Sequence, residues 1–161
     1  MPGETKVRYP DSRNDRSIQD GLEFQDLVTD RLAQDGIIIQ NYCSKAYQLQ
    51  KGENRQGWEI KLDNRCTETG RLSIEVAERT ALDRPWVPSG IYAGHSAFYI
   101  HGNRERFWLF ETSFLQRLHK TARYAEKDDN PPTIRTFYLP ISDADKYGLR
   151  FEVEHPDGVP F

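Results

Sequence analysis

Two glutamates and one lysine are the residues of this chain whose types and spacing best suit chemistry. Glu59 and Lys61 alternate with apolar residues in segment 58–63, and Glu75 does the same in segment 72–77. Strict alternation predicts two half-buried strands that carry these charged side chains on one face. Turn-forming residues between the segments predict a hairpin. In one antiparallel register Glu59 lies opposite Glu75, and Lys61 lies opposite Ser73.

Two opposed carboxylates favour a divalent cation. Directly opposed residues have Cβ atoms about 4.5–5.5 Å apart, and carboxylates at that separation repel each other. A Mg²⁺ or Mn²⁺ ion held by Glu59 and Glu75 would offset the repulsion. Lys61 would then orient a water or stabilise developing charge, which together predicts metal-dependent phosphodiester hydrolysis. The alternative is a solvated strand face, because Glu-x-Lys is common on antiparallel strands.

A resemblance to a nuclease superfamily supports the first interpretation. The pattern Gly57-x-Glu59-Ile60, followed by Ile74-Glu75-Val76-x-Glu78-Arg79, resembles the PD-(D/E)XK nucleases, especially small phage and bacterial members. The resemblance covers roughly residues 20–110. It implies a catalytic metal held by Glu59 and Glu75, and DNA as the substrate.

The chain departs from the family pattern at two positions. The first acid is Glu59 rather than an aspartate, and Ala77 stands where the family has a lysine. Lys61 lies on the same face of the neighbouring predicted strand, so we expect it to replace that lysine. A non-catalytic nucleic-acid-binding protein, or a phage accessory protein that binds a protein partner without metal, remains the alternative on this scaffold.

Glu23 is the residue of the first predicted helix that best matches a further family feature. Apolar residues at helical spacing predict a helix over 17–34, with Ser17 as its N-cap. The resemblance implies that a glutamate of this helix reaches the metal site, and Glu23 is the best match. A surface glutamate is the alternative.

Five polar residues are candidates for nucleic-acid contacts. Two of them lie in the loop before the first predicted strand, and three lie on the polar face of a second predicted helix, which Thr112 or Ser113 can cap. Phosphate contacts by such groups position a duplex, whereas a solvated loop and a solvated helix face are the alternatives. The five residues are Arg55, Gln56, Arg117, Lys120 and Arg123.

The remaining pattern predicts an α+β fold. Apolar runs predict strands at 37–39, 90–92, 97–100, 107–110 and 134–139, with a hairpin turn at 101–104 and a turn or short helix at 143–148. With the resemblance, this gives an α/β (α+β) protein with a mixed central β-sheet flanked by helices and a restriction-endonuclease-like core. We expect a flexible arm at 1–16, one domain at 17–155 and a tail at 156–161.

Composition restricts the setting. The chain has 161 residues, a net charge of −3, 37% hydrophobic and 12% aromatic residues, which is typical of a folded domain. No run approaches the roughly 20 apolar residues of a transmembrane helix. Isolated Cys43 and Cys66 favour a reducing, cytoplasmic setting in a bacterium or phage-infected cell, and we expect no membrane partner. His95 and His101 lie near predicted turns and are expected at the surface. By analogy with small nucleases, we expect a C2 homodimer.

Overall fold

The computed structural model describes residues 12–39, 57–94 and 96–154. The predictions for Arg55 and Gln56, for Cys43 and His95, for most of the N-terminal arm and for the C-terminal tail therefore lie outside the described residues. No helix in the described part of the chain is long and apolar enough to cross a membrane.

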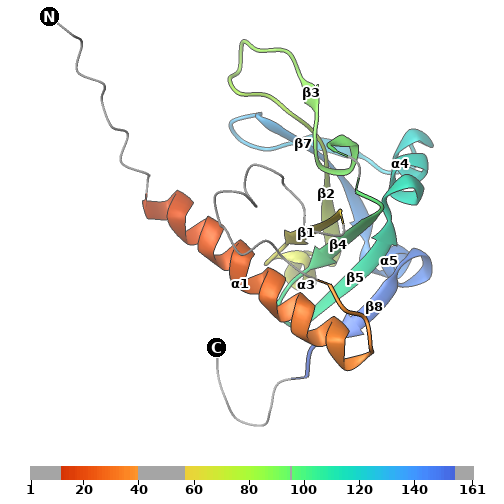
Figure 1. The fold of residues 1–161 in the computed structure, drawn as a ribbon. Coiled ribbons are helices and arrows are strands. Elements are labelled where there is room, and N and C mark those ends of the chain that lie inside the picture. Colours follow the sequence, from red (N-terminus) through yellow and green to blue (C-terminus); the bar gives the residue numbers. More distant parts are fainter. Residues whose placement is uncertain (1–11, 40–56, 95, 155–161) are drawn as a thin grey trace, which may run out of the picture.

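The described residues form an α+β fold, as predicted, with helices flanking two four-stranded sheets (Figure 1). The helices are α1 (Ser12–Gln34), α3 (Cys66–Thr69), α4 (Thr112–Lys120), α5 (Ile141–Tyr147) and the 3₁₀ turn η1 (Gly90–Tyr92). The mixed sheet has the order β1 (Trp58–Leu62), β4 (Phe98–Gly102), β5 (Arg106–Glu111), β8 (Leu149–Glu152). The antiparallel sheet has the order β3 (Val87–Pro88), β2 (Arg71–Glu78), β7 (Ile134–Pro140), β6 (Glu126–Asp128).

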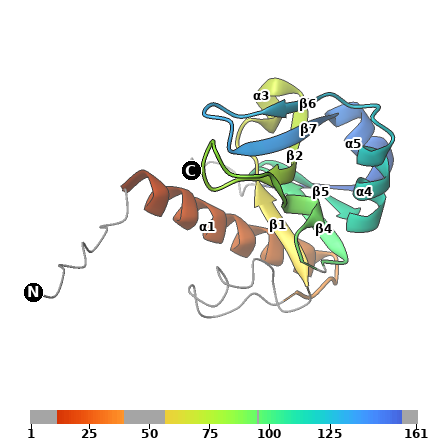
Figure 2. The same cartoon turned by 90° about the horizontal axis from the view of Figure 1, so that it is seen from above.

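Two apolar clusters hold these elements in layers. On one face of the mixed sheet, α1 packs Phe24 and Val28 against Ile60 and Phe107 (Figure 2). The other face of the mixed sheet contributes Tyr99, Trp108 and Phe110 to a second cluster, which includes the apolar residues Leu72, Ile74 and Val76 of β2. The mixed sheet therefore lies between α1 and the antiparallel sheet.

The alternation predicted for the first strand is confirmed. Ile60 is buried in the cluster with α1, and Trp58 and Leu62 pack against the same cluster. Because side chains alternate along a strand, Glu59 and Lys61 lie on the opposite face, turned toward the antiparallel sheet.

The predicted hairpin is wrong, because β1 and β2 belong to different sheets. Glu59 is the parallel partner of Tyr99 on β4, and Glu75 is the antiparallel partner of Thr136 on β7. Likewise, Lys61 pairs with His101 and Ser73 pairs with Tyr138.

The connection between the two strands explains the difference. It contains a fully buried cysteine, Cys66, which begins the helix α3, and Gly70 ends that helix at φ 70°. Burial raises the pKa of the Cys66 thiol to about 11, so this side chain behaves as a small apolar core residue. A helical turn anchored in the core redirects the chain from one sheet to the other.

Other element boundaries also differ from the prediction. α1 begins at Ser12 rather than at Ser17, and α4 ends at Lys120, so Arg123 follows the helix. Residues 37–39 form no strand, and residues 90–92, predicted as a strand, form the 3₁₀ turn η1. The strands predicted at 97–100, 107–110 and 134–139, the turn between the first two, and the short helix near 143–148 are confirmed.

Candidate functional site

Glu59 and Lys61 form an ion pair on the face of β1 that is turned toward the second sheet. The Lys61 Nζ lies 2.8 Å from the Glu59 Oε1. The Glu59 side chain is 14% exposed and the Lys61 side chain 39%. The pair is therefore partly withdrawn from water, although the lysine side stays open to solvent. Electrostatic interactions at such a partly buried place are stronger than on a free surface.

Glu75 approaches this pair from the antiparallel sheet. Burial lowers the pKa of Lys61, but the negative charges of Glu59, Glu75 and Glu78 outweigh it, and the net shift of the Lys61 pKa is upward. Glu75 is therefore close enough for its charge to act on Lys61 and on Tyr99, although the strands that carry Glu59 and Glu75 do not pair. We call Glu59, Lys61 and Glu75 the acid–lysine cluster.

A serine and a glycine position Glu75. The buried Ser89 donates a hydrogen bond from Oγ to the Glu75 Oε1 at 2.6 Å, and its amide donates to the Val76 carbonyl at 3.1 Å. Gly90 follows at φ 56°, and a Cβ there would lie 2.1 Å from the Glu75 carbonyl oxygen. The chain at the start of η1 is therefore shaped around Glu75. The sequence analysis did not assign Ser89 a role, and the Ser-Gly pair in a breaker-rich connection is the signal that could have found it.

A buried tyrosine and a buried histidine lie beneath the cluster. Tyr99 is fully buried, and its hydroxyl has no hydrogen-bond partner in the described part of the chain. Burial, and then the charges of Glu59, Glu75 and Asp63, raise the pKa of Tyr99 well above its ordinary value. His101 stacks on Tyr99 with ring centroids 5.9 Å apart and is only 4% exposed, so its predicted surface position is wrong.

Asp63 fixes this histidine and links the two sheets. Its Oδ2 lies 3.1 Å from the His101 Nε2 and accepts a hydrogen bond from the Ser73 amide at 3.0 Å. Its Oδ1 accepts one from the Arg65 amide at 3.2 Å. Burial raises the pKa of Asp63. His101 and the two amides lower the pKa by more than burial raises it, so the net shift is downward.

Glu23 does not join the cluster. It lies on α1, which covers the opposite face of the mixed sheet, and its side chain is 49% exposed. Hydrogen bonds from Gln19 and Arg104 lower its pKa, and the Arg104 Nη2 lies 3.0 Å from its Oε2. The placement corresponds to the surface glutamate that was the alternative.

The three basic residues near α4 are exposed, and within the described segments they form no ion pair. The Arg117 guanidinium lies 5.6 Å from the centre of the Phe114 ring, and the Lys120 Nζ lies 6.0 Å from that of Tyr92. The Arg123 Nη1 donates to the Tyr147 hydroxyl at 3.4 Å. Their positive charges therefore face solvent.

The described residues contain no group of three or more histidine, cysteine, aspartate or glutamate side chains that could hold a metal ion. Glu59 and Glu75 supply two carboxylates, and Mg²⁺ is commonly bound by one or two carboxylates together with waters and substrate phosphates. An ion held by these two carboxylates alone would have to take its remaining ligands from water and substrate. No family model, no curated protein and no solved structure matches this chain.

Proposed function

We propose that this protein is a nuclease that hydrolyses phosphodiester bonds of DNA with Mg²⁺ or Mn²⁺. The observation that carries the proposal is the acid–lysine cluster, in which β1 and β2 of two different sheets bring carboxylates around one ammonium group. Two carboxylates at a partly buried place repel each other unless a cation offsets the repulsion or one of them binds a proton. Lys61 offsets part of it, and a divalent ion would offset the rest.

The cluster residues have distinct roles in this proposal. Glu59 and Glu75 would hold the ion, which when bound polarises the phosphate and lowers the pKa of a water. Lys61 keeps its charge because its pKa is raised, and its flexible stem lets the ammonium move from Glu59 to a substrate phosphate, where it stabilises developing charge. Ser89 fixes the orientation of the Glu75 carboxylate through their 2.6 Å hydrogen bond.

DNA binding and dimerisation complete the proposal. Arg117, Lys120 and Arg123 are exposed and can contact backbone phosphates without reading sequence. A homodimer with C2 symmetry would present two clusters to the two strands of a duplex.

One observation favours the non-catalytic alternative. The Lys61–Glu59 pair at 2.8 Å already neutralises one of the two carboxylates. Ala77, at the position of the family lysine, packs against the core. A protein that binds nucleic acid without cleaving it would need no more than this.

Cleavage of labelled DNA by the purified protein separates the two. We expect cleavage in Mg²⁺ or Mn²⁺ that stops when EDTA is added. Lys61→Ala is expected to lower the rate by roughly 10²-fold or more, the order seen when one preorganised stabilising group is removed. Glu68→Gln is the matched control, because Glu68 is exposed on α3 and pairs with Arg65.

Metal binding is tested without cleavage. Mn²⁺ should raise the melting temperature of the wild type through ligand linkage, and Glu75→Gln should shrink the shift. If the protein retains DNA but shows no metal-dependent cleavage, the nuclease proposal is wrong and the protein is a non-catalytic DNA-binding protein. If the wild type neither retains nor cleaves DNA, the remaining interpretation is an accessory protein that binds a protein partner.

A further inference from the structure

A tyrosine, a histidine and a glutamate from three different elements form a chain of side-chain contacts at α4. The Tyr92 hydroxyl, at the end of η1, lies 2.7 Å from the Nδ1 of His119 in the last turn of α4. The other ring nitrogen of His119, Nε2, contacts the Oε1 of Glu126, the first residue of β6. We call these three residues the Tyr–His–Glu relay, and none of them belongs to the acid–lysine cluster.

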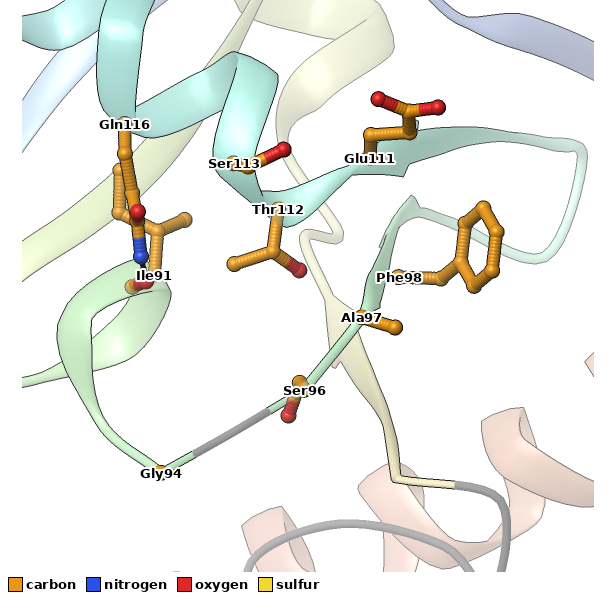
Figure 3. A pocket seen from close by; sticks show the side chains of 9 residues that line it. All are labelled: Ile91, Gly94, Ser96, Ala97, Phe98, Glu111, Thr112, Ser113 and Gln116. Atoms are coloured by element: carbon orange, nitrogen blue, oxygen red, sulfur yellow. Dashed lines mark hydrogen bonds between the residues drawn. The ribbon is translucent and has the colours of Figure 1, made fainter.

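The backbone brings the three residues of the relay together. η1 is tied to α4, because the Gln116 side chain points toward η1 and donates from Nε2 to the Ile91 carbonyl at 2.8 Å (Figure 3). After α4, Ala122 has φ 54° and its amide donates to the His119 carbonyl at 3.1 Å. The chain therefore turns back directly after the helix, and Glu126 returns to its end.

The relay is held by packing and lies at the surface. The centroid of the His119 ring lies 5.4 Å from that of Phe137, with the rings stacked, and 5.5 Å from that of Tyr92 in an edge contact. Tyr92 is partly exposed, and the side chains of His119 and Glu126 are 19% and 43% exposed. The imidazole is therefore fixed in place, while the relay stays open to solvent.

The contacts indicate where the protons of the relay lie. An ionised carboxylate only accepts hydrogen bonds, so the His119 Nε2 donates to Glu126 and carries the ring proton. In a neutral imidazole the other nitrogen is then an acceptor, and the Tyr92 hydroxyl donates to Nδ1. The Gln116 carbonyl, the other acceptor of this hydroxyl, is more distant at 3.4 Å. A hydroxyl bonded to a base that a third group orients is the arrangement of an activated nucleophile.

A cation beside Tyr92 favours a phosphate as the group attacked. Lys120 follows His119 directly, is exposed, and has its Nζ 6.0 Å from the centre of the Tyr92 ring. A phosphodiester that pairs with Lys120 is therefore brought beside the Tyr92 hydroxyl. Burial, and then the charge of Glu126, raise the pKa of Tyr92. The hydroxyl therefore keeps its proton until a base removes it during attack.

We propose that Tyr92 is a nucleophile that attacks phosphodiester bonds without metal and becomes covalently linked to the phosphate. The Tyr92 oxygen bonds to phosphorus while the His119 Nδ1 takes the phenolic proton, which it later releases to water. The bond from phosphorus to the leaving oxygen breaks on the opposite side, and that oxygen takes a proton from water, so one ester is exchanged for another. Glu126 positions the imidazole and stabilises its protonated form. The choice of DNA as the substrate rests on the proposed function, whereas the reactivity of Tyr92 does not.

An activated phosphodiester, bis(para-nitrophenyl) phosphate, tests Tyr92 without DNA and without metal. In EDTA the wild type should release nitrophenolate in a burst equal to the amount of protein, and peptide mass mapping should place the remaining phosphate ester on Tyr92. His119→Ala should slow the burst by about 10²-fold or more, the typical contribution of a general base. Added imidazole should restore part of the rate in this variant. Added formate should do the same for Glu126→Ala.

Tyr124→Phe is the matched control. The Tyr124 hydroxyl donates to the Asp143 Oδ2 at 2.7 Å rather than to a histidine, and its ring also packs near Phe137. The burst should be lost in Tyr92→Phe and unchanged in Tyr124→Phe. Absence of the burst in the wild type, a phosphate ester on another residue, or an unchanged burst in His119→Ala would overturn the proposal. Mapping of the wild-type adduct decides the matter even if a variant fails to fold.

Labelled DNA in EDTA tests the substrate. A covalent protein–DNA adduct should remain on a denaturing gel, and its label should map to Tyr92. If the nitrophenyl ester modifies Tyr92 but DNA does not, the reactive tyrosine stands and DNA is not its substrate. Metal-dependent cleavage of DNA without any modification of Tyr92 would keep the nuclease and overturn this inference. Modification of Tyr92 by a protein that shows no metal-dependent cleavage would do the reverse.

Discussion

Asp63 joins the two sheets through its carboxylate. It follows β1 directly, accepts a hydrogen bond from the amide of Ser73 on β2 and lies against His101 on β4. Its side chain is 12% exposed, so these hydrogen bonds are formed in a largely dry environment. Hydrogen bonds to a charged acceptor stabilise more than neutral ones. We infer that Asp63 holds β1 and β2 in the relation that brings Glu75 to Glu59.

Asp63→Asn should lower the free energy of unfolding at pH 7 by about 1–3 kcal/mol. An asparagine offers one accepting oxygen, and its amide group would face a donor on the other side. The pKa of Asp63 is lowered from 3.8 in the folded state. Its ionised form therefore contributes stability above pH 3.8, and this contribution is lost as the pH falls through the lower, folded pKa.

Urea unfolding at pH 7 and between pH 4 and 2 checks this prediction. The difference between wild type and Asp63→Asn should narrow as the pH falls. Asp83→Asn, a change at an exposed aspartate in the β2–β3 connection, should have little effect at any of these pH values. A constant difference down to pH 2 would exclude the role of the ionised carboxylate.

Single residues also show how far sequence reasoning reaches. The shared face of Glu59 and Lys61 follows from the period of a strand, and it is confirmed. The charge of Glu75 acts on Lys61, but the pairing expected to place Glu75 opposite Glu59 is wrong. Tyr99 and His101 could not be placed at the site, because the parallel pairing of β1 with β4 depends on segments about 40 residues apart.

At the scale of elements, η1 is the part that holds Glu75 in position. Gly90 has φ 56° and lies so close to β2 that a side chain there would meet the Glu75 backbone. Ser89, one residue earlier, donates to the Glu75 carboxylate. The backbone and the side chain of Glu75 are therefore both held by one short segment.

Gly90→Ala should destabilise the protein by at least about 1–3 kcal/mol, because alanine is strained at positive φ and its Cβ would displace the Glu75 backbone. The same substitution at Gly21 in α1 is the matched control. A Cβ there meets nothing within 4 Å, and alanine should stabilise the helix by about 0.5–1 kcal/mol. Thermal and urea unfolding measure both. Equal effects of the two substitutions would show that η1 does not need to approach β2 so closely.

The connection between β1 and β2 shows why an element can be misassigned. Its polar and glycine residues match a tight turn, but Cys66 at its centre is fully buried and begins α3. A lone cysteine gives no sequence signal of its direction, because burial depends on the core that surrounds it. The strands on either side were therefore predicted correctly and paired wrongly.

At the scale of the whole molecule, charge is distributed unevenly despite a net charge of −3. Many described basic side chains lie next to carboxylates; Arg31, Arg104, Arg135 and Arg150 are examples. Arg117, Lys120 and Arg123 instead contact aromatic rings around α4. Sequence predicts the apolar stripe of α4 and the positions of the basic residues near it. Sequence does not predict that these basic residues lie apart from carboxylates within the described segments, because that depends on the tertiary fold.

Replacement of Arg117, Lys120 and Arg123 with glutamine should weaken DNA binding most strongly at low salt. Each positive charge removed from a backbone phosphate should reduce the slope of log affinity against log salt by about 0.7–0.9, so three such charges would reduce it by roughly 2–3. Fluorescence anisotropy with a labelled duplex over a range of salt concentrations measures this slope.

A control with the same change in net charge separates a local interaction with phosphate from a general effect of charge. Three exposed arginines on other elements and loops, Arg16, Arg65 and Arg84, are suitable for the same replacement. If the residues around α4 bind DNA phosphates directly, only their replacement should reduce the slope of log affinity against log salt by roughly 2–3. The slope counts the counterions released from the phosphates that the protein neutralises. Equal slopes for the two triple variants would assign the residues around α4 to a solvated surface and would place the DNA elsewhere on the molecule.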